Sequence, residues 1–214
     1  PPPKGEHNWP IYLEHQYDEI DRQVIADIAE RKLPVFGNPP DKTWGTTRNA
    51  ALHQMEHFFK FSFAEFGAYE DAMTLQTWAV NHSLLSPYLN VGLLHAEEVI
   101  AAAIDRYNQG GIPLASAEGF IRQIIGWREY INGLYWYFGD EYRKENQLQA
   151  TRTLLPLFLD SSKTQMKCVA TQVRDIEDRA WVHHIPRLMV LSNLALITGT
   201  SPQEFLDWMR RSFI

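Results

Sequence analysis

The sequence has little cysteine and no long apolar run. Cys168 is the only cysteine among 214 residues, so the chain cannot form an internal disulfide, and one thiolate cannot build a metal site alone. A membrane-spanning helix needs about 20 apolar residues, whereas the most apolar segment, 188–197, is interrupted by Ser192 and Asn193. The start, rich in proline and charge, lacks the apolar core of a signal peptide. These absences predict a soluble, cytoplasmic protein without a membrane segment.

Several functional motifs are also missing. The sequence contains no Walker A pattern, no G-x-G-x-x-G, no HExxH and no arrangement typical of a Ser-His-Asp triad. Its net charge of −6 argues against a protein whose whole surface binds nucleic acid, because such binding requires clustered lysine and arginine. A local basic groove stays open, built from Arg122, Arg128, Arg187, Arg210 and Arg211.

The pattern that is present is helical. Apolar residues recur at intervals of three and four along almost the whole chain, and no segment shows sustained alternation with period two. The fold is therefore predicted to be all-α. Hydrophobic residues make up 45% of the chain, enough for one well-buried domain. Residues 1–16 open on three prolines and predict an extended linker, which leaves 17–214 as the helical domain.

Local signals predict where individual helices begin. A stripe of Ile20, Val24, Ile25, Ile28 and Ala29 predicts a first helix. Thr46 or Thr47 is typical of the N-cap of a second helix, which we expect to stop near Gly67. His95 and Glu98 have the spacing of a capping box, and Ser116 is expected to cap the helix after that one.

The helix after Ser116 is expected to run to about Phe138 and to bury one face from end to end, on the stripe Phe120, Ile124, Trp127, Ile131 and Leu134. Arg128 lies about 40° from Ile124 around this helix, at the edge of the stripe. A guanidinium there needs an anionic partner. Two partners stay open: a structural carboxylate, or a phosphate or cofactor.

Two histidines stand just before a predicted helix. Pro186 is tolerated only in the first turn of a helix, so His183 and His184 are expected at the N-terminus of an apolar helix over 188–197, which should be fully buried. The helix dipole and burial favour neutral imidazoles that can exchange a proton. Capping or a satisfied core position is the commoner explanation of such a pair, and no third ligand is spaced for a metal. Ser201-Pro202 predicts the start of a last helix, which carries Trp208.

Ser83 and Ser86 flank the turn that leads into Pro87. Free N–H groups and hydroxyls at a helix start can bind a phosphate, but simple N-capping by one serine explains the same residues.

Three strings in this order resemble signatures of the photolyase/cryptochrome family. Residues 82–92 (His-Ser-Leu-Leu-Ser-Pro-Tyr-Leu-Asn-Val-Gly) resemble the family's Thr-Ser-Arg-Leu-Ser-Pro-Tyr-Leu. Residues 126–130 (Gly-Trp-Arg-Glu-Tyr) resemble its Trp-Arg-Glu-Phe helix, and 181–189 (Trp-Val-His-His-Ile-Pro-Arg-Leu-Met) resemble Met-His-Asn-Arg-x-Arg-Met. One branch of the family matches best, the bacterial iron–sulfur branch, whose studied members repair (6-4) photoproducts. Its sequences are similar to this chain over 119–130, in the paired histidines and in the Met-x-Cys upstream of them.

The resemblance implies a helical FAD-binding domain, and it implies roles residue by residue. It implies FAD contacts for Tyr69, His82, Ser83, Leu84, Leu85, Ser86, Arg128 and Arg187. It implies catalytic roles for His183 and His184, a wall of the lesion pocket for Trp127, an electron-transfer role for Trp208, and one ligand of an iron–sulfur (4Fe-4S) cluster for Cys168.

The chain also departs from the family pattern. Leu84 stands where the family has an arginine, His82 where it has a threonine, and Ile124 where other branches have a glutamate, with Gln123 adjacent. The resemblance further implies that an N-terminal antenna domain is missing before residues 1–16. It also implies that the domain is incomplete at its C-terminus, where the segment facing the flavin N5 edge and three more cysteines would follow.

The function implied by the resemblance is that of a DNA photolyase, a lyase that moves an electron from reduced FAD to a lesion in UV-damaged DNA. The intact protein is expected to be a monomer. Two alternatives stay open: a cryptochrome-like blue-light sensor without repair activity, and an inert helical scaffold.

Overall fold

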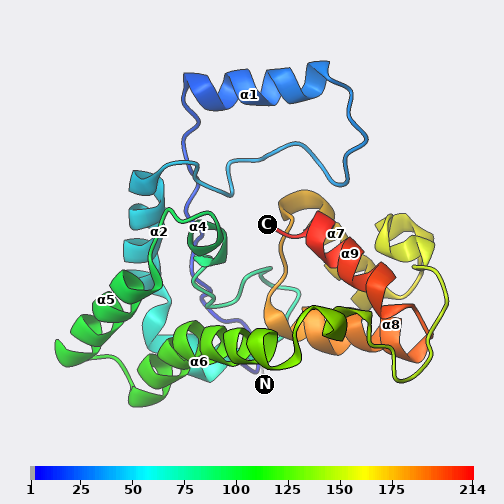
Figure 1. The fold of residues 1–214 in the computed structure, drawn as a ribbon. Coiled ribbons are helices and arrows are strands. Elements are labelled where there is room, and N and C mark those ends of the chain that lie inside the picture. The colour runs from blue at the N-terminus through cyan, green and yellow to red at the C-terminus, as the bar shows by residue number, and fades with distance from the viewer. Residues whose placement is uncertain (1–2) are drawn as a thin grey trace. The chain divides into compact units, whose positions relative to one another are not determined.

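The computed structural model describes residues 3–214, and that part of the chain is helical without any β-strand (Figure 1). The α-helices are α1 (Glu19–Glu30), α2 (Arg48–Phe61), α3 (Phe66–Tyr69), α4 (Ser86–Asn90), α5 (Ala96–Asn108), α6 (Leu114–Phe138), α7 (Lys167–Arg179), α8 (Asn193–Ile197) and α9 (Pro202–Ser212). Shorter turns are the 3-10 helices η1 (Phe63–Glu65), η2 (Asp140–Lys144), η3 (Pro156–Phe158) and η4 (Ser161–Lys163) and the π-helix η5 (Pro186–Ser192). The predicted all-α class is confirmed.

The chain divides into two compact units. The first comprises Pro1–Gln16 and Trp44–Asp140, and the second comprises Tyr17–Thr43 and Glu141–Ile214. Pro1 and Pro2, which begin the predicted linker, lie outside the described residues. The rest of that linker is extended and belongs to the first unit.

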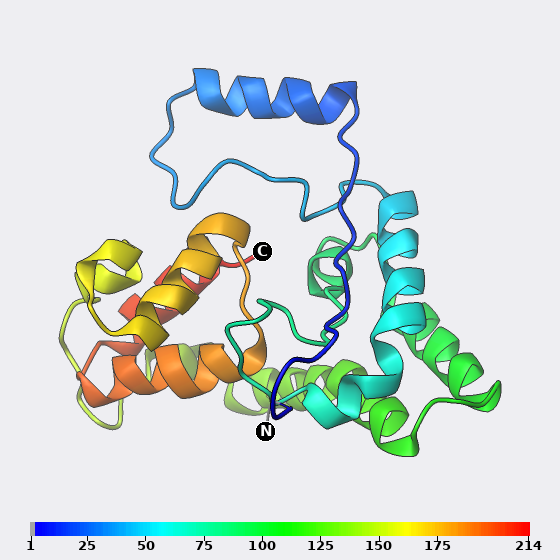
Figure 2. The same ribbon diagram turned by 180° about the vertical axis from the view of Figure 1, so that it is seen from behind.

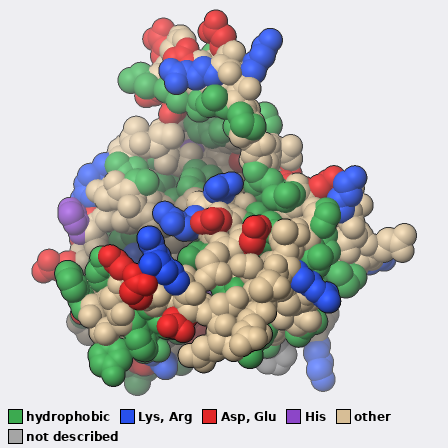
Figure 3. All heavy atoms as spheres, turned by 45° about the vertical axis from the view of Figure 1, so that its right-hand side comes forward, with side chains coloured by type: hydrophobic (Ala, Val, Ile, Leu, Met, Phe, Trp, Pro, Cys, Tyr) green, Lys and Arg blue, Asp and Glu red, His purple; other side chains and the backbone are tan. Residues whose placement is uncertain are grey.

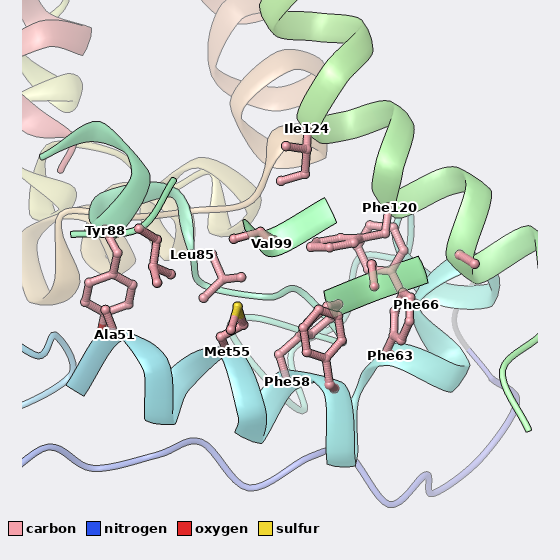
Figure 4. Close-up of a cluster of buried hydrophobic side chains, with 14 residues drawn as sticks. Ala51, Met55, Phe58, Phe63, Phe66, Leu85, Tyr88, Val99, Phe120 and Ile124 are labelled. Carbon is pink, nitrogen blue, oxygen red and sulfur yellow. The ribbon is translucent and has the colours of Figure 1, made fainter. Parts of the chain in front are cut away.

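The core of the first unit is aromatic. Phe58 and Phe63 are almost fully buried, and both rings pack against Phe120 of α6, at centroid distances of 4.8 and 5.6 Å (Figure 4). Phe66 meets the same ring at 5.6 Å. Such aromatic groupings add about 0.5–1.5 kcal/mol per pair to the benefit of burial. One phenylalanine of α6 thus organises the end of α2 and the turns that follow it.

The second helix begins where the sequence predicts and ends earlier. The Thr47 side chain accepts a hydrogen bond from the Ala50 amide, which confirms the N-cap. The prediction that the helix continues to Gly67 is wrong, because α2 ends at Phe61 and two short turns follow. At Gly67 a Cβ would lie 2.9 Å from the backbone of Ala115. The break in the helix after Phe61 places Gly67 against the start of α6.

Ser116 does not cap α6, contrary to the prediction. The N-cap is Pro113, and Ser116 is buried in the first turn. Its hydroxyl accepts from the Gly67 amide at 3.0 Å and donates to the Ala64 carbonyl at 2.8 Å. Backbone groups that the break after α2 leaves without helical partners thereby find one in Ser116. The serine joins two elements instead of starting one.

Helix α6 reaches Phe138 as predicted, but only its first half is buried. Phe120 and Ile124 lie in the core, whereas Trp127 and Ile131 are each 57% exposed. The prediction that one face is buried from end to end is therefore wrong for the second half. The period of three and four residues sets which residues share a face, but not whether another element covers that face.

The second unit has its own core around α7 and α9. Phe158, Val173 and Leu191 are fully buried there, and Trp208 packs edge-on against Phe158 at 5.0 Å. Gly37 approaches this core so closely that a Cβ would lie 2.7 Å from the Glu177 carbonyl, and its φ of +87° is one that glycine adopts readily. Helix α1 contains the stripe that predicted the first helix, but the stripe residues Ile20, Val24 and Ile28 are exposed.

The apolar helix expected over 188–197 is not fully buried. Leu191 and Ala195 are buried, but Leu188 and Leu196 are each 56% exposed and Ile197 is 79% exposed. The segment also begins as the π-helix η5, in which the Ser192 hydroxyl donates to the Arg187 carbonyl. The continuous apolar sequence of this segment predicted burial on all sides. In the second unit only the side with Leu191 and Ala195 is buried. The predicted start of the last helix at Ser201-Pro202 is confirmed.

One ion pair ties the start of α2 to the start of α5. Arg48 donates to both carboxylate oxygens of Glu98, at 2.9 and 2.6 Å, and Glu98 accepts from the His95 amide in the predicted capping box. The bonds from Arg48 lower the pKa of Glu98 from 4.5 to about 2. Because the folded pKa is the lower one, the stabilisation is complete above pH 4.5 and is lost as the pH falls toward 2.

Replacing Glu98 should therefore lower stability and flatten its acid dependence. We expect Glu98→Gln to lower the melting temperature at pH 7 by about 2–4 °C, as befits a partly exposed pair. Thermal unfolding followed by circular dichroism between pH 2.5 and 7 measures both effects. The control is Glu97→Gln, which removes the same charge from the same helix turn but leaves the bonds to Arg48 intact. Equal losses in the two variants would contradict this account.

Candidate functional site

The residues singled out in the sequence fall into both units. Tyr69, His82–Ser86, Trp127 and Arg128 belong to the first unit. Cys168, His183, His184, Arg187 and Trp208 belong to the second.

The first signature forms a loop that the core holds from below. Leu85 and Tyr88 are each 1% exposed and point toward Ala51 and Met55 of α2 (Figure 4). The Ser83 carbonyl accepts from the side-chain amide of Gln54, also on α2, at 3.0 Å. The loop is therefore fixed to α2 both by apolar contacts and by a hydrogen bond.

The five signature positions differ in what they can offer to a ligand. His82 and Ser83 are half-buried and Ser86 is exposed, so these three present polar side chains. The Leu84 and Leu85 side chains are buried, which leaves their backbone as the part able to meet a phosphate. Leu84 has a φ of +58°, in the left-handed region that non-glycine residues rarely adopt.

Glu70 follows Tyr69 in the chain, and its backbone carbonyl also contacts His82. One ring nitrogen of His82, Nε2, lies 3.0 Å from the Glu70 carbonyl oxygen, which favours the tautomer with a proton on that nitrogen. The half-buried ring of Tyr69 packs edge-on against Trp9 at 5.5 Å and against His7 at 4.9 Å. Tyr69 therefore presents an aromatic surface that residues before the helical domain help to form.

Sequence reasoning missed Asn81. Its side chain is fully buried, and neither its amide nitrogen nor its oxygen has a hydrogen-bond partner among the described residues. A buried polar group without a partner costs about 1–3 kcal/mol, so native structures keep such groups mainly where a ligand or water completes them. No motif marks this asparagine. Its only signal is its place directly before His82.

Trp127 and Arg128 are both exposed on α6. Arg128 donates to the Ile124 carbonyl at 3.5 Å, and residues 3–214 provide no carboxylate within ion-pair distance of it. The alternative of a structural ion pair is therefore not realised in the described part of the chain. The guanidinium keeps most of its donors available, next to an indole ring that is 57% exposed.

In the second unit, the two histidines stand at the start of a helical segment, as predicted. His183 is 5% exposed, while His184 is exposed, and their ring centroids are 5.9 Å apart. Trp181 flanks the buried ring at 6.5 Å. The adjacent imidazoles thus lie in different environments, one inside the unit and one at its surface.

Arg187 follows one turn later and is held by its surroundings. Its Nη2 donates to the Val182 carbonyl at 2.9 Å, and its guanidinium carbon lies 4.3 Å from the centroid of the Phe213 ring. Burial lowers the pKa of Arg187 to about 10, so the group stays cationic at neutral pH. Its Nε is buried and has no partner among the described residues. A cation with a free buried donor suits an anionic or carbonyl ligand.

The last two predicted residues contrast in exposure. Cys168 is exposed in the first turn of α7. Trp208 is 3% exposed among Phe158, Phe205 and Phe213, and its indole N–H has no hydrogen-bond partner in the described residues. Trp208 thus sits in a dense aromatic cluster of the second core.

Comparison with solved structures identifies the fold. A crystal structure of a bacterial class III photolyase from Agrobacterium tumefaciens matches 79% of this chain with a TM-score of 0.65, at 21% sequence identity. The match covers 35% of that protein. The architecture of this chain is thus the helical domain of a photolyase.

Comparison of sequences leads to particular relatives. The chain is 42% identical over 192 residues, 89% of its length, to the (6-4) photolyase of Agrobacterium fabrum. A 77-residue stretch is 40% identical to the uncharacterized protein R853 of Acanthamoeba polyphaga mimivirus, which covers 36% of this chain and 59% of that protein. No family model matches the chain. The chain is a homologue of the photolyase family, as its three signatures indicated, and it spans 38% of the length of the (6-4) photolyase.

Within residues 3–214, no helix combines the length and apolarity needed to cross a membrane.

A buried histidine supports the signature loop from the N-terminal segment. His15 is 5% exposed, and its Nε2 lies 3.1 Å from the Tyr88 hydroxyl. That hydroxyl accepts from the Gly45 amide, so it donates to a neutral His15. Burial is the main cause that lowers the pKa of His15, with His53 and His57 adding to it and Gln54 opposing it. Because the unfolded chain takes up this proton first, stability falls as the pH drops below about 6.5.

We expect His15→Gln to remove part of this acid sensitivity. The wild-type chain should lose several degrees of melting temperature between pH 7.5 and 5.5, and the variant should lose less over the same interval. Thermal melts at the two pH values measure the difference. His53→Gln, which removes a histidine near the same site but no bond to Tyr88, should keep most of the wild-type loss. A variant as acid-sensitive as the wild type would refute this role of His15.

Proposed function

We propose that this chain is the FAD-binding helical part of a light-driven DNA-repair enzyme that acts on a pyrimidine lesion in UV-damaged DNA, the (6-4) photoproduct. The observation that carries the proposal is the 42% identity to a (6-4) photolyase over 89% of the chain. The reaction class is that of a lyase. When bound, reduced FAD would supply the electron that starts the repair.

The residues of the chain suit FAD at the first signature. The buried amide of Asn81 lacks both a donor and an acceptor partner within residues 3–214, which suits a polar cofactor group. In this proposal His82, Ser83 and Ser86 offer polar side chains to the phosphates and the ribityl chain, and Leu84 and Leu85 offer backbone. The family resemblance also assigns FAD contacts to Tyr69 and Arg128 of the first unit and, separately, to Arg187 of the second unit. Cofactor binding would thereby satisfy groups that the fold leaves unsatisfied.

The difference in exposure between the histidines suggests separate roles. A residue that gives a proton to a lesion must be reachable by the lesion, and His184 is exposed whereas His183 is buried. We therefore assign the proton to His184. His183 would act as its neighbour inside the second unit, where it orients and supports the exposed ring.

Two tryptophans suit the lesion and the electron. The exposed indole of Trp127 could stack on an unstacked base, an interaction worth about 1–3 kcal/mol per base. Trp208 lies among three aromatic rings with centroids 5.0–5.8 Å away, which suits an electron route through the second unit. Both roles follow from the family resemblance, and the observed environments are compatible with them.

An iron–sulfur cluster does not fit this chain on its own. A 4Fe-4S cluster is held by about four cysteine thiolates, and Cys168 is the only cysteine of the chain. Cys168 is exposed and could serve as one ligand beside others from outside the chain. No step of the proposed function depends on a cluster.

A blue-light sensor with the same flavin site is the second candidate. The net charge of −6 favours it, because DNA binding needs local excess positive charge. On the face drawn in Figure 3, lysine and arginine side chains lie interspersed with aspartate and glutamate. Damaged-DNA binding at physiological salt separates the two candidates, since a sensor need not bind the lesion. For either candidate we propose a monomer in the cytoplasm.

FAD binding is the first test, and Asn81 offers a sharp variant. The wild-type chain should bind FAD saturably in equilibrium dialysis. Asn81→Leu should bind it about tenfold more weakly while keeping its melting temperature, since an apolar residue of similar shape removes an unsatisfied buried amide. Asn90→Leu, an exposed position four residues after Ser86, should bind like the wild type. Absence of saturable binding in the wild type would contradict the proposal and support an inert scaffold.

The histidines are tested by repair. In the gene product that carries this sequence, blue light should restore oligonucleotides that contain a (6-4) photoproduct. We expect His184→Ala to lower the rate by about 100-fold or more, as befits the loss of a general acid, while the flavin absorbance is kept. His53→Ala serves as the control for loss of an exposed histidine outside the pair. Repair that survives replacement of both His183 and His184 would overturn their catalytic role.

A further inference from the structure

The N-terminal segment is bound along the first unit as a strap, which we define as residues 3–16. It is extended and runs beside α2 (Figure 2). The Nε2 atom of His7 lies 3.3 Å from the Glu65 carboxylate, and the Trp9 indole N–H donates to the Gln76 side chain at 2.8 Å. His57 of α2 forms a hydrogen bond with the backbone of Ile11. A linker that only joined two domains would need none of these contacts.

The loop that carries the first signature is strained at two buried positions. Val80 has a φ of +53° and is 1% exposed, and Leu84 has a φ of +58° and is 4% exposed. A β-branched residue in the left-handed region is a genuine outlier, at a cost of order 1–3 kcal/mol. Such a conformation persists only when surrounding contacts hold it. The loop therefore depends on whatever contacts the backbone near Val80.

Tyr12 of the strap makes that contact. Its hydroxyl donates to the Val80 carbonyl at 3.0 Å and forms a second bond with the Thr77 hydroxyl, and its ring packs on Trp78 at 4.9 Å. Burial raises the pKa of Tyr12 to about 12, so the hydroxyl keeps its proton and can donate at neutral pH. His15 bonds Tyr88 at the other end of the same loop. The strap thus holds the loop on both sides of Asn81–Ser86.

We propose that Tyr12 and His15 are positioning residues that hold the signature loop in its strained, ligand-ready conformation. They need not touch the ligand. Tyr12 secures the turn at Val80 before the signature, and His15 secures Tyr88 after it. That this conformation is the one that binds FAD rests on the proposed function, but the holding of the loop does not.

The variant Tyr12→Phe tests the loop without any cofactor. It keeps the ring on Trp78 and removes only the hydroxyl. Amide hydrogen exchange measured by mass spectrometry on the full chain should be about 3- to 10-fold faster in residues 77–88 and unchanged in α5. Thr77→Val, which removes one of the same bonds from the loop side, should show a smaller acceleration in the same peptides.

The matched control is Tyr17→Phe. Tyr17 also uses its hydroxyl in one backbone bond, from the Lys42 amide at 2.9 Å, but it lies in the second unit. It should leave exchange in residues 77–88 unchanged. Exchange in that loop that stays at the wild-type rate in Tyr12→Phe would overturn the proposal, as would an equal acceleration in Tyr17→Phe.

FAD titration of the same variants extends the test to function. Tyr12→Phe should weaken FAD binding about 3- to 10-fold under conditions in which the variant is fully folded, while Tyr17→Phe should bind FAD like the wild type. Faster loop exchange with unchanged FAD affinity would overturn the positioning role. If the wild-type chain binds no FAD, the proposed function fails, and the exchange data alone still decide whether the strap holds the loop.

Discussion

The Tyr88 hydroxyl is the point on which the first unit depends. The ring lies in the core beside Ala51, while the hydroxyl bonds the Gly45 amide and the His15 imidazole. It therefore joins the signature loop, the entrance to α2 and the strap through one buried oxygen. A Cβ on Gly45 would lie 2.8 Å from Nδ1 of His15, so the geometry around this contact leaves no room for a larger residue.

Two buried polar groups without a hydrogen-bond partner among the described residues lie at or beside the family signatures in the sequence. Asn81 precedes the first signature, and Arg187 belongs to the third. An unpaired buried amide or guanidinium N–H lowers stability unless something completes it. In the proposed function a bound cofactor would complete such groups.

The loop that carries the first signature also holds an unfavourable backbone conformation. Val80 and Leu84 are both buried and left-handed, and each could relax if the loop were free. The core holds Leu85, α2 holds the Ser83 carbonyl, and the strap holds the Val80 carbonyl. These three attachments act on neighbouring residues of the loop and oppose its relaxation. The strap, whose sequence predicted a domain linker, thereby helps to shape a candidate cofactor site.

Much of the local structure was predictable from the sequence, because it depends on neighbouring residues. The Thr47 cap, the capping box at His95, the length of α6 and the proline start of α9 all follow from contacts within a few positions. The identification as a photolyase homologue followed from three short sequence motifs. Each motif alone can be explained by helix capping or packing, but their order along the chain matches the family. Burial did not follow in the same way. Trp127 and Leu188 share faces with core residues and are nevertheless exposed.

What only the tertiary structure decided is which groups meet across long sequence distances. Tyr12 reaches Val80, His15 reaches Tyr88 and Ser116 reaches Gly67, over separations that no periodic pattern encodes. The left-handed turn at Val80 and the unpaired amide of Asn81 likewise arise from packing, since neither residue type favours such a state by itself. The sequence by itself determined the helical class, several helix starts and the relation to the photolyase family. The folded chain determined which of its polar groups are left for a ligand, because that depends on every contact around them.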